Sequence, residues 1–287
     1  MRSRATLAWA AYLVPAAALS LYALVQWLSA LANRVPVLYG EGAVANAARL
    51  ARNGIAYLDT DPSRFVAANY PPLYFHLASI GDPLISGRVA SIASTLAIAA
   101  MVFFGARSGG RLAAVALAAG WLALAPVMIW GPALKPDLVA LALTALAVVL
   151  LDRRRELAPI AGFALVFATL AKPTALLPMA ALVAWLAWSD RATLVRFGFG
   201  AAVAVVAAAV TVYLDSVPDV WRHVVTWNAL SWSAEQTVSV AVIGLIVIAA
   251  PLGIAAFTRG VAGARAAYLA GALAIVVLAG REGATIN

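Results

Sequence analysis

The feature that most constrains this chain is a series of long apolar runs with almost no charge inside them. The longest extends from residue 7 to residue 32 without one acidic or basic side chain. An α-helix needs about 20 apolar residues to cross the hydrocarbon core of a bilayer. Runs of this length indicate membrane-spanning helices, and the sequence therefore predicts an all-α polytopic membrane protein.

Nine such runs can be placed along the chain, which predicts about nine transmembrane helices within a single domain, residues 1–287; counts of eight or ten stay open. The fourth to sixth runs are short, and they would need neighbours from Gly131–Lys135 and from the Lys172–Pro173 junction to reach spanning length. The nine runs cover residues 7–32, 89–106, 112–130, 138–151, 157–171, 174–188, 197–214, 238–257 and 266–279.

Composition excludes several other classes of protein. The chain is 64% apolar and 11% charged, whereas globular chains are about 45–50% apolar and about 25% charged. The absence of cysteine excludes disulfides, iron–sulfur clusters, cysteine-ligated zinc and cysteine nucleophiles. No Walker, Rossmann or G-x-S-x-G pattern is present. A soluble enzyme, a nucleotide-driven pump and a serine hydrolase are therefore disfavoured.

The net charge of +8 is distributed as a topology signal, and we assign no nucleic-acid partner to it. With a cytoplasmic N-terminus, eleven of the twenty basic residues and three acids fall on the cytoplasmic side, in the N-terminus and short turns. This asymmetry follows the positive-inside rule. The first run lacks a small-residue cleavage motif, so we interpret it as a span. The preference for Ala, and for Arg over Lys, is typical of a GC-rich bacterial genome. We therefore expect the protein in a bacterial plasma (inner) membrane.

Two longer segments fall on the outer side, residues 33–88 and residues 215–237, and we expect function there. The second is rich in tryptophan, which suits a membrane–water interface. In the first, residues 41–55 predict an amphipathic helix lying along the membrane surface, closed by Gly54. Its predicted apolar stripe consists of Val44, Ala47, Ala48, Ala51 and Ile55.

After this helix comes the element Tyr70-Pro-Pro-Leu-Tyr74. Two consecutive prolines bar a regular helix through that point. The apolar stretch that follows, residues 73–80, is too short to span a bilayer. We therefore expect it to dip into the membrane interface.

Several stretches in order resemble the GT-C class of membrane glycosyltransferases, in the branch of the protein O-mannosyltransferases and lipid A aminoarabinose transferases. The resemblance rests on their order and spacing over most of residues 36–185. The stretches are GEGAVANAARLARNGIAYLD, YPPLY, GRVAS, KPDLVALAL and AKPTALLP. Two departures stand out: the family usually carries an Asp-Glu pair where this chain has Gly40-Glu41, and its members are commonly longer.

The resemblance implies transfer of a sugar from a polyprenyl-phosphate carrier to an acceptor on the outer face of the membrane. Such a reaction needs a base for the acceptor hydroxyl and positive charge for the departing phosphate. The family pattern makes Glu41 the candidate catalytic base. The alternative is that Glu41 only stabilises the first turn of a helix.

Candidate substrate-binding residues are the charges and tyrosines at the expected outer boundary. Lys135, Lys172 and Arg88 are candidates to face the carrier phosphate, with snorkelling or interface anchoring as alternatives. Asp137 is expected either to orient Lys135 or to bind a divalent cation with Glu41, with a local ion pair as the alternative. The tyrosines expected to stack on a sugar ring are Tyr70 and Tyr74.

A second hypothesis is a non-catalytic GT-C relative that serves as a structural or lipid-binding subunit of a larger membrane complex. The missing second acid and the short chain motivate it. A secondary transporter is a weaker alternative because the chain shows no clear internal repeat. The expected partners are therefore a polyprenyl-phosphate sugar, membrane lipids and protein subunits.

Overall fold

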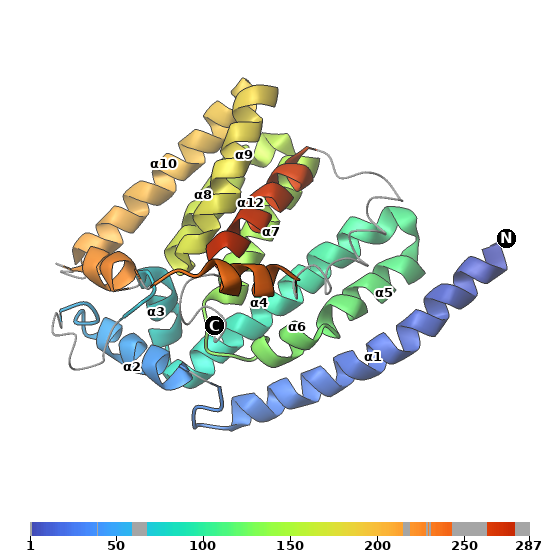
Figure 1. Ribbon diagram of the computed structural model, residues 1–287, viewed down its shortest axis with the longest axis horizontal. Coiled ribbons are helices and arrows are strands. Elements are labelled where there is room, and N and C mark those ends of the chain that lie inside the picture. The colour runs from blue at the N-terminus through green and yellow to red at the C-terminus, as the bar shows by residue number, and fades with distance from the viewer. Residues whose placement is uncertain are drawn as a thin grey trace.

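The computed structural model describes residues 2–38, 40–58, 68–214, 219–227, 229, 231–242 and 263–278, and the side chains within them apart from residues 2–6, 211–214 and 278. The protein is all-helical, as the apolar runs predict (Figure 1). The α-helices are α1 (Arg2–Ala32), α2 (Glu41–Arg52), α3 (Pro72–Ser79), α4 (Pro83–Ala106), α5 (Arg111–Leu122), α6 (Ala125–Trp130), α7 (Asp137–Arg153), α8 (Ala158–Ala171), α9 (Leu176–Ser189), α10 (Arg191–Leu214) and α12 (Ala264–Leu278).

Short helical turns join several of these helices. Three are 3₁₀ turns, η2 (Arg107–Gly109), η3 (Arg155–Leu157) and η4 (Pro173–Ala175), and one is a π-helical turn, η5 (Arg222–Thr226). Residues 234–242 are also helical. The α7–α8 and α8–α9 connections are thus tight turns between neighbouring helices.

The expectation of nine spans is wrong. Within the described ranges, three helices are long and apolar enough to cross a membrane: Leu7–Ala32, Pro83–Gly109 and Arg191–Val210. These three segments belong to α1, α4 with η2, and α10. They indicate a multi-pass membrane protein with fewer full-length spans than the apolar runs suggested.

Local features of the sequence explain why fewer helices reach spanning length. The third expected span is interrupted after Leu122, and Pro126 then occupies the first turn of α6, where its fixed φ suits a helix start. Gly131–Lys135 stays outside regular helix, so α7 has only 17 residues. Lys172 is extended and ends α8 after 14 residues. The eighth expected span, residues 238–257, lies mostly outside the described residues.

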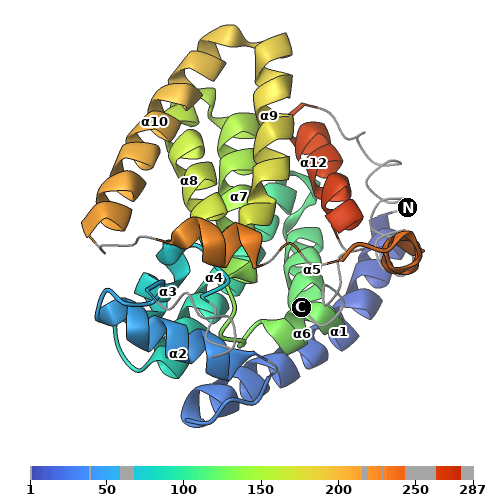
Figure 2. The same cartoon turned by 60° about the vertical axis from the view of Figure 1, so that its left-hand side comes forward.

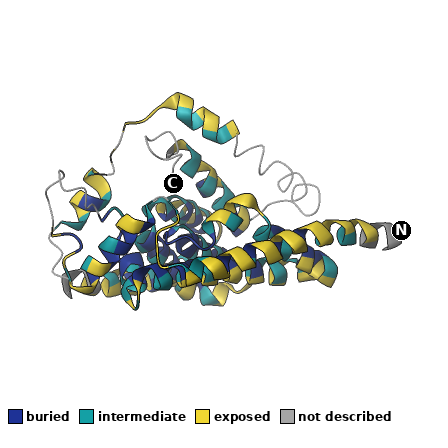
Figure 3. Cartoon of the chain, turned by 90° about the horizontal axis from the view of Figure 1, so that it is seen from below, coloured by how far each residue is buried: buried dark blue, intermediate teal, exposed yellow. Residues whose placement is uncertain are grey.

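The helices pack in two connected groups (Figure 2). α1 packs on α5 and α4, and α4 packs on α7; α7 in turn packs on α8, which packs on α10, while α9 pairs with α12. One stripe of α1 is buried and includes Ala16, Ala23 and Trp27. The indole of Trp27 donates to the carbonyl of Met128 at 3.0 Å. The rest of α1 is largely exposed apolar surface (Figure 3), as expected of a helix that faces lipid.

α8 and α10 approach until their backbones touch, which two glycines permit. A Cβ added at Gly162 would lie 2.1 Å from the carbonyl oxygen of Phe197, and one at Gly200 would lie 1.8 Å from that of Pro159. Small residues at helix crossings are the usual device for close packing inside membranes. The α8–α10 pair therefore has no room for larger side chains at these positions.

The predicted surface helix forms as α2 over Glu41–Arg52, and Gly54 follows it with a φ of +68°. Four of the five residues predicted for its apolar stripe are buried, whereas Ile55 is exposed. This face packs on protein, chiefly α3, and is not the lipid-facing surface expected. Residues 72–79 form α3, which packs on α2, α4 and α8 and is therefore covered by the protein as well.

Candidate functional site

The helices α2 and α3 lie at one end of the bundle (Figure 1). Five charged side chains that are far apart in the sequence come together near α2 and the adjoining ends of α4, α7 and α8. Each is placed by the beginning or end of a helix. We call these five residues the ionic cluster: Glu41, Arg88, Lys135, Asp137 and Lys172. All were candidates from the sequence, and the structure brings them together.

Glu41 and Arg88 form a completely buried ion pair. The Nε of Arg88 donates to Oε1 of Glu41 at 3.1 Å, and its Nη2 donates to Oε2 at 2.7 Å. Both side chains are 0% exposed. Two parallel bonds between a guanidinium and a carboxylate are the strongest geometry available to such a pair.

The remaining donors of Arg88 bind backbone carbonyls at the end of α1. Nη1 donates to Ala30 at 2.6 Å and to Asn33 at 2.5 Å, while Nη2 also donates to Val35 at 3.0 Å. A guanidinium has five N–H groups, and all five are engaged within the protein. Arg88 thus satisfies carbonyls that the end of a helix leaves without partners.

The carboxylate of Glu41 is likewise fully hydrogen-bonded within the protein. Besides Arg88, its carboxylate accepts from the backbone N–H groups of Val37 at 2.9 Å, Leu38 at 3.2 Å and Leu134 at 2.8 Å. Burial raises the pKa of Glu41, but the bonds from Arg88 and these amides outweigh it and leave the pKa below its ordinary value. Glu41 therefore stays ionised and fixes the entry to α2 and the approach to α7.

Lys135 lies just before α7 and is 5% exposed. Its carbonyl accepts from the hydroxyl of Ser91 at 3.1 Å, and its ammonium lies 5.9 Å from the centre of the Trp130 ring. A Cβ added at Gly40 would lie 2.9 Å from the Lys135 ammonium. Burial lowers the pKa of Lys135; the Asp137 carboxylate opposes this shift. The ammonium thus borders Gly40, the residue directly before Glu41.

Asp137 pairs with Lys172, across the gap between the start of α7 and the end of α8. The ion pair with Lys172 matches the local ion pair that was the alternative for Asp137, and the charge of Asp137 also acts on Lys135. The two side chains are 34% and 23% exposed, respectively. This is the part of the ionic cluster that a ligand can reach.

The two candidate tyrosines are buried in the same region. Tyr74 is 0% exposed, and its hydroxyl donates to the carbonyl of Gly87 at 3.3 Å. Burial raises its pKa well above the ordinary value. Tyr70 is 7% exposed, and its carbonyl accepts from the hydroxyl of Tyr57 at 2.7 Å. Neither ring presents an open face for stacking on a sugar.

The sequence did not predict the role of His223 in the second outer segment. The sequence favours a surface position for it, yet His223 is 0% exposed. Its Nδ1 accepts from the backbone N–H of Ala68 at 3.1 Å, and its ring packs edge-on against Tyr57 at 5.6 Å. The imidazole thus supplies the acceptor that this buried backbone N–H needs. The contact ties the residues before α3 to η5.

The described residues contain no group of three or more His, Asp or Glu side chains placed to hold a metal ion. The pairing of Glu41 with Arg88 and of Asp137 with Lys172 leaves each carboxylate next to a cation. Neighbouring cations disfavour a divalent ion at the same oxygens. Comparison with known protein families, with curated proteins and with solved structures finds no match.

Proposed function

We propose that the protein handles a polyprenyl-phosphate-linked sugar at the ionic cluster, as the resemblance to GT-C glycosyltransferases implies. The observation that carries the proposal is the convergence of the candidate charges from α2, α4, α7 and the end of α8 at one end of the bundle. Ionisable groups at such a boundary are costly and mark substrate sites more often than they serve packing alone.

In this proposal the two lysines face the phosphate of the carrier. Lys135 borders Gly40 and Lys172 is partly exposed, so an anion that reaches Lys172 meets two positive charges within the cluster. Arg88 is reassigned from phosphate binding to positioning because its donors are already engaged. Glu41 likewise becomes a positioning residue.

Transfer forms a bond between the acceptor oxygen and the sugar's anomeric carbon, and it breaks the bond from that carbon to the carrier phosphate. The phosphate leaves as an anion beside the lysines, and the acceptor proton passes to a base. Asp137 is the carboxylate of the ionic cluster with exposed surface. We therefore assign the acceptor proton to Asp137 in place of Glu41.

The charge distribution supports an orientation for this site. The end of the bundle opposite α2 and α3 carries most of the unpaired arginines in the described ranges. By the positive-inside rule that end is cytoplasmic. The ionic cluster then lies on the outer side of a bacterial plasma membrane, where lipid-linked sugars are used by this class.

The first test is binding of the carrier itself. Native mass spectrometry of the detergent-solubilised protein would compare undecaprenyl phosphate with undecaprenol, which lacks the phosphate. We expect retention of the phosphate form to fall at least tenfold in Lys135→Gln, as loss of a charge-assisted contact costs about 1.5–3 kcal/mol. Arg49→Gln removes an exposed cation from α2 and is the matched control. Equal retention of the two lipids by the wild type would refute the proposal.

One observation favours the second candidate function, a binding-only subunit. Glu41 is wholly enclosed, and position 40 is a glycine where the GT-C enzymes usually carry an aspartate. Neither position therefore offers a carboxylate that a substrate can reach. Incubation with a polyprenyl-phosphate sugar separates the candidates. A transferase releases polyprenyl phosphate and loses this activity in Asp137→Asn but not in Glu235→Gln, an exposed carboxylate outside the ionic cluster. A binding-only subunit retains the intact lipid-linked sugar.

A further inference from the structure

The end of the bundle opposite α2 and α3 carries a strong excess of positive charge. Among the described side chains this end holds eight arginines and three acids, Asp152, Glu156 and Asp190. All eight arginines are exposed. We call them the basic rim: Arg107, Arg111, Arg153, Arg154, Arg155, Arg191, Arg196 and Arg265.

Contacts between helices gather the rim into one surface. Arg153 at the end of α7 donates to the carbonyl of Phe104 at 3.2 Å and to that of Gly105 at 2.9 Å. Both carbonyls belong to the last turn of α4. The end of α4 therefore lies beside the end of α7, and two ion pairs extend this side of the molecule to the α9–α10 turn and the first residues of α12 (Figure 1). The rim is thus one surface built from several turns.

The acids neutralise only part of this surface. Arg265 pairs with Asp152 at 2.9 Å and joins α12 to α7. Arg155 pairs with Asp190 at 3.0 Å and joins η3 to the α9–α10 turn. These two pairs hold the turns together. Arg154 lies 3.7 Å from Glu156, so the remaining five arginines carry the net positive charge.

Among the described residues, five rim arginines have no carboxylate within ion-pair distance, and one of them, Arg153, is engaged by the two carbonyls of α4. The other four are Arg107 and Arg111 on either side of the α4–α5 turn, and Arg191 and Arg196 in the first turns of α10. The guanidinium of Arg107 lies over the ring of Phe104, 5.9 Å from its centre. Such stacking leaves the edge of the guanidinium open for a further partner.

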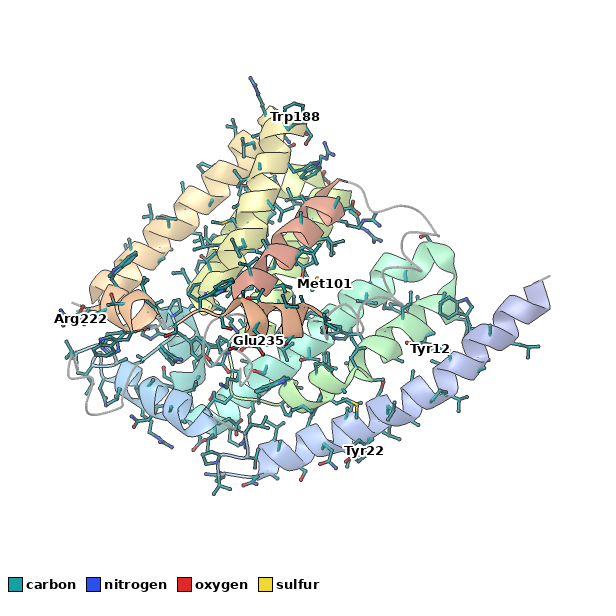
Figure 4. All side chains as sticks on the ribbon, viewed as in Figure 1. Tyr12, Tyr22, Met101, Trp188, Arg222 and Glu235 are labelled. Carbon is teal, nitrogen blue, oxygen red and sulfur yellow. The ribbon has the colours of Figure 1, made fainter. Side chains whose placement is uncertain are left out.

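The helices that carry the basic rim indicate where it lies relative to the bilayer. α4 and α10 are two of the three helices able to cross a membrane, and the rim lies where α4 ends and α10 begins. Trp188, at the tip of α9 beside this turn, is 94% exposed (Figure 4). Exposed tryptophans at the ends of apolar helices are typical of the headgroup region.

We propose that Arg107, Arg111, Arg191 and Arg196 bind the phosphates of anionic phospholipids in the adjacent leaflet. A guanidinium matches two phosphate oxygens with two parallel N–H bonds, and a phosphatidylglycerol headgroup supplies the net negative charge that the rim lacks. An acidic protein would offer the same charge, but the rim lies at headgroup depth, where lipid phosphates are already concentrated. The interaction does not depend on the ionic cluster at the other end.

The test measures which lipids the protein retains. The protein would be extracted from bilayers holding equal amounts of phosphatidylglycerol and phosphatidylcholine with identical acyl chains, and its bound lipids would be counted by native mass spectrometry. We expect the wild type to be enriched in phosphatidylglycerol. We expect the variant R107Q/R111Q/R191Q/R196Q to lose that enrichment by roughly fivefold or more, given the strength of arginine–headgroup attraction. The corresponding four-lysine variant should retain most of it.

The control is R34Q/R49Q, which removes two exposed arginines from the opposite end of the molecule. This variant should keep the phosphatidylglycerol enrichment. The proposal would be overturned by a wild type without lipid preference, or by an equal loss in the control, which would show an effect of net charge alone. An acidic protein that copurifies with the wild type but not with the rim variant, in the absence of lipid preference, would also overturn it.

Discussion

Arg88 holds both carboxylate oxygens of Glu41 from 47 residues away, and the pair lies completely inside the protein. The same guanidinium binds the last carbonyls of α1, and the same carboxylate binds the amide of Leu134. One ion pair therefore joins α1, α2, α4 and the segment before α7. The candidate site is built around this pair because Lys135 directly follows Leu134.

Removing one partner of this pair should destabilise the protein strongly. An uncompensated buried charge costs about 3–5 kcal/mol, so Arg88→Met or Glu41→Leu should lower the free energy of unfolding in mixed micelles by that amount. The double variant should lose less than the sum of the two single losses, because neither charge is then left alone. Removal of the exposed partner Arg265 is the control, and it should leave stability nearly unchanged. Additive losses would contradict the coupling.

The depressed pKa of Glu41 makes this stabilisation depend on pH. Because the folded-state pKa is below the ordinary value of 4.5, the carboxylate stabilises the fold above that pH and loses its effect as pH falls through the folded pKa. The difference in melting temperature between wild type and Glu41→Gln should therefore be full at pH 6 and shrink below pH 4. A difference that is constant over this range would show that Glu41 acts through shape alone.

The α8–α10 contact should tolerate no added methyl group. Gly200→Ala places a Cβ against the backbone of Pro159, which cannot rotate away, and overpacking of this kind costs about 1–3 kcal/mol. Gly198→Ala, on the same helix, meets nothing within 4 Å and is the matched control. Thermal unfolding in detergent should show a lower midpoint for Gly200→Ala and an unchanged midpoint for Gly198→Ala. Equal midpoints would mean that the helices do not touch here.

Replacing His223 should loosen the beginning of α3. His223→Phe keeps the volume of the ring but removes the acceptor for the amide of Ala68, and an unsatisfied buried donor costs about 1–3 kcal/mol. Hydrogen–deuterium exchange should become faster in peptides covering residues 68–75. Peptides from α8 should exchange as in the wild type. Unchanged protection at Ala68 would argue against its hydrogen bond to His223.

The sequence predicts the composition of the site better than its geometry. Arg88 is the one charge between Asp82 and Arg107, and a lone charge in an apolar helix needs a partner, which is a signal for its pairing. Nothing local identifies Glu41 as that partner, since the choice depends on how α2 folds back on α4. The stripe of α2 was predicted because helical periodicity alone places Val44 and Ala48 on one face.

Span number was predicted poorly because apolar composition does not say where a helix stops. The helices beside Lys172 and Gly131–Lys135 end there although the surrounding sequence is largely apolar. The burial of His223 depends on a contact 155 residues away. Its short segment has no periodicity that could indicate a buried face. These features are set by tertiary packing, which single-residue propensities do not report.

The brevity of α8 has a consequence for the membrane around it. Its 14 residues extend about 21 Å at 1.5 Å per residue, whereas the hydrocarbon core of a bilayer is about 30 Å thick. Lipids that meet this side of the protein must compress to match it, or else headgroups and water must bend inward. We expect that depression to form where α8 ends at Lys172, so that water reaches the partly exposed pair of Asp137 and Lys172.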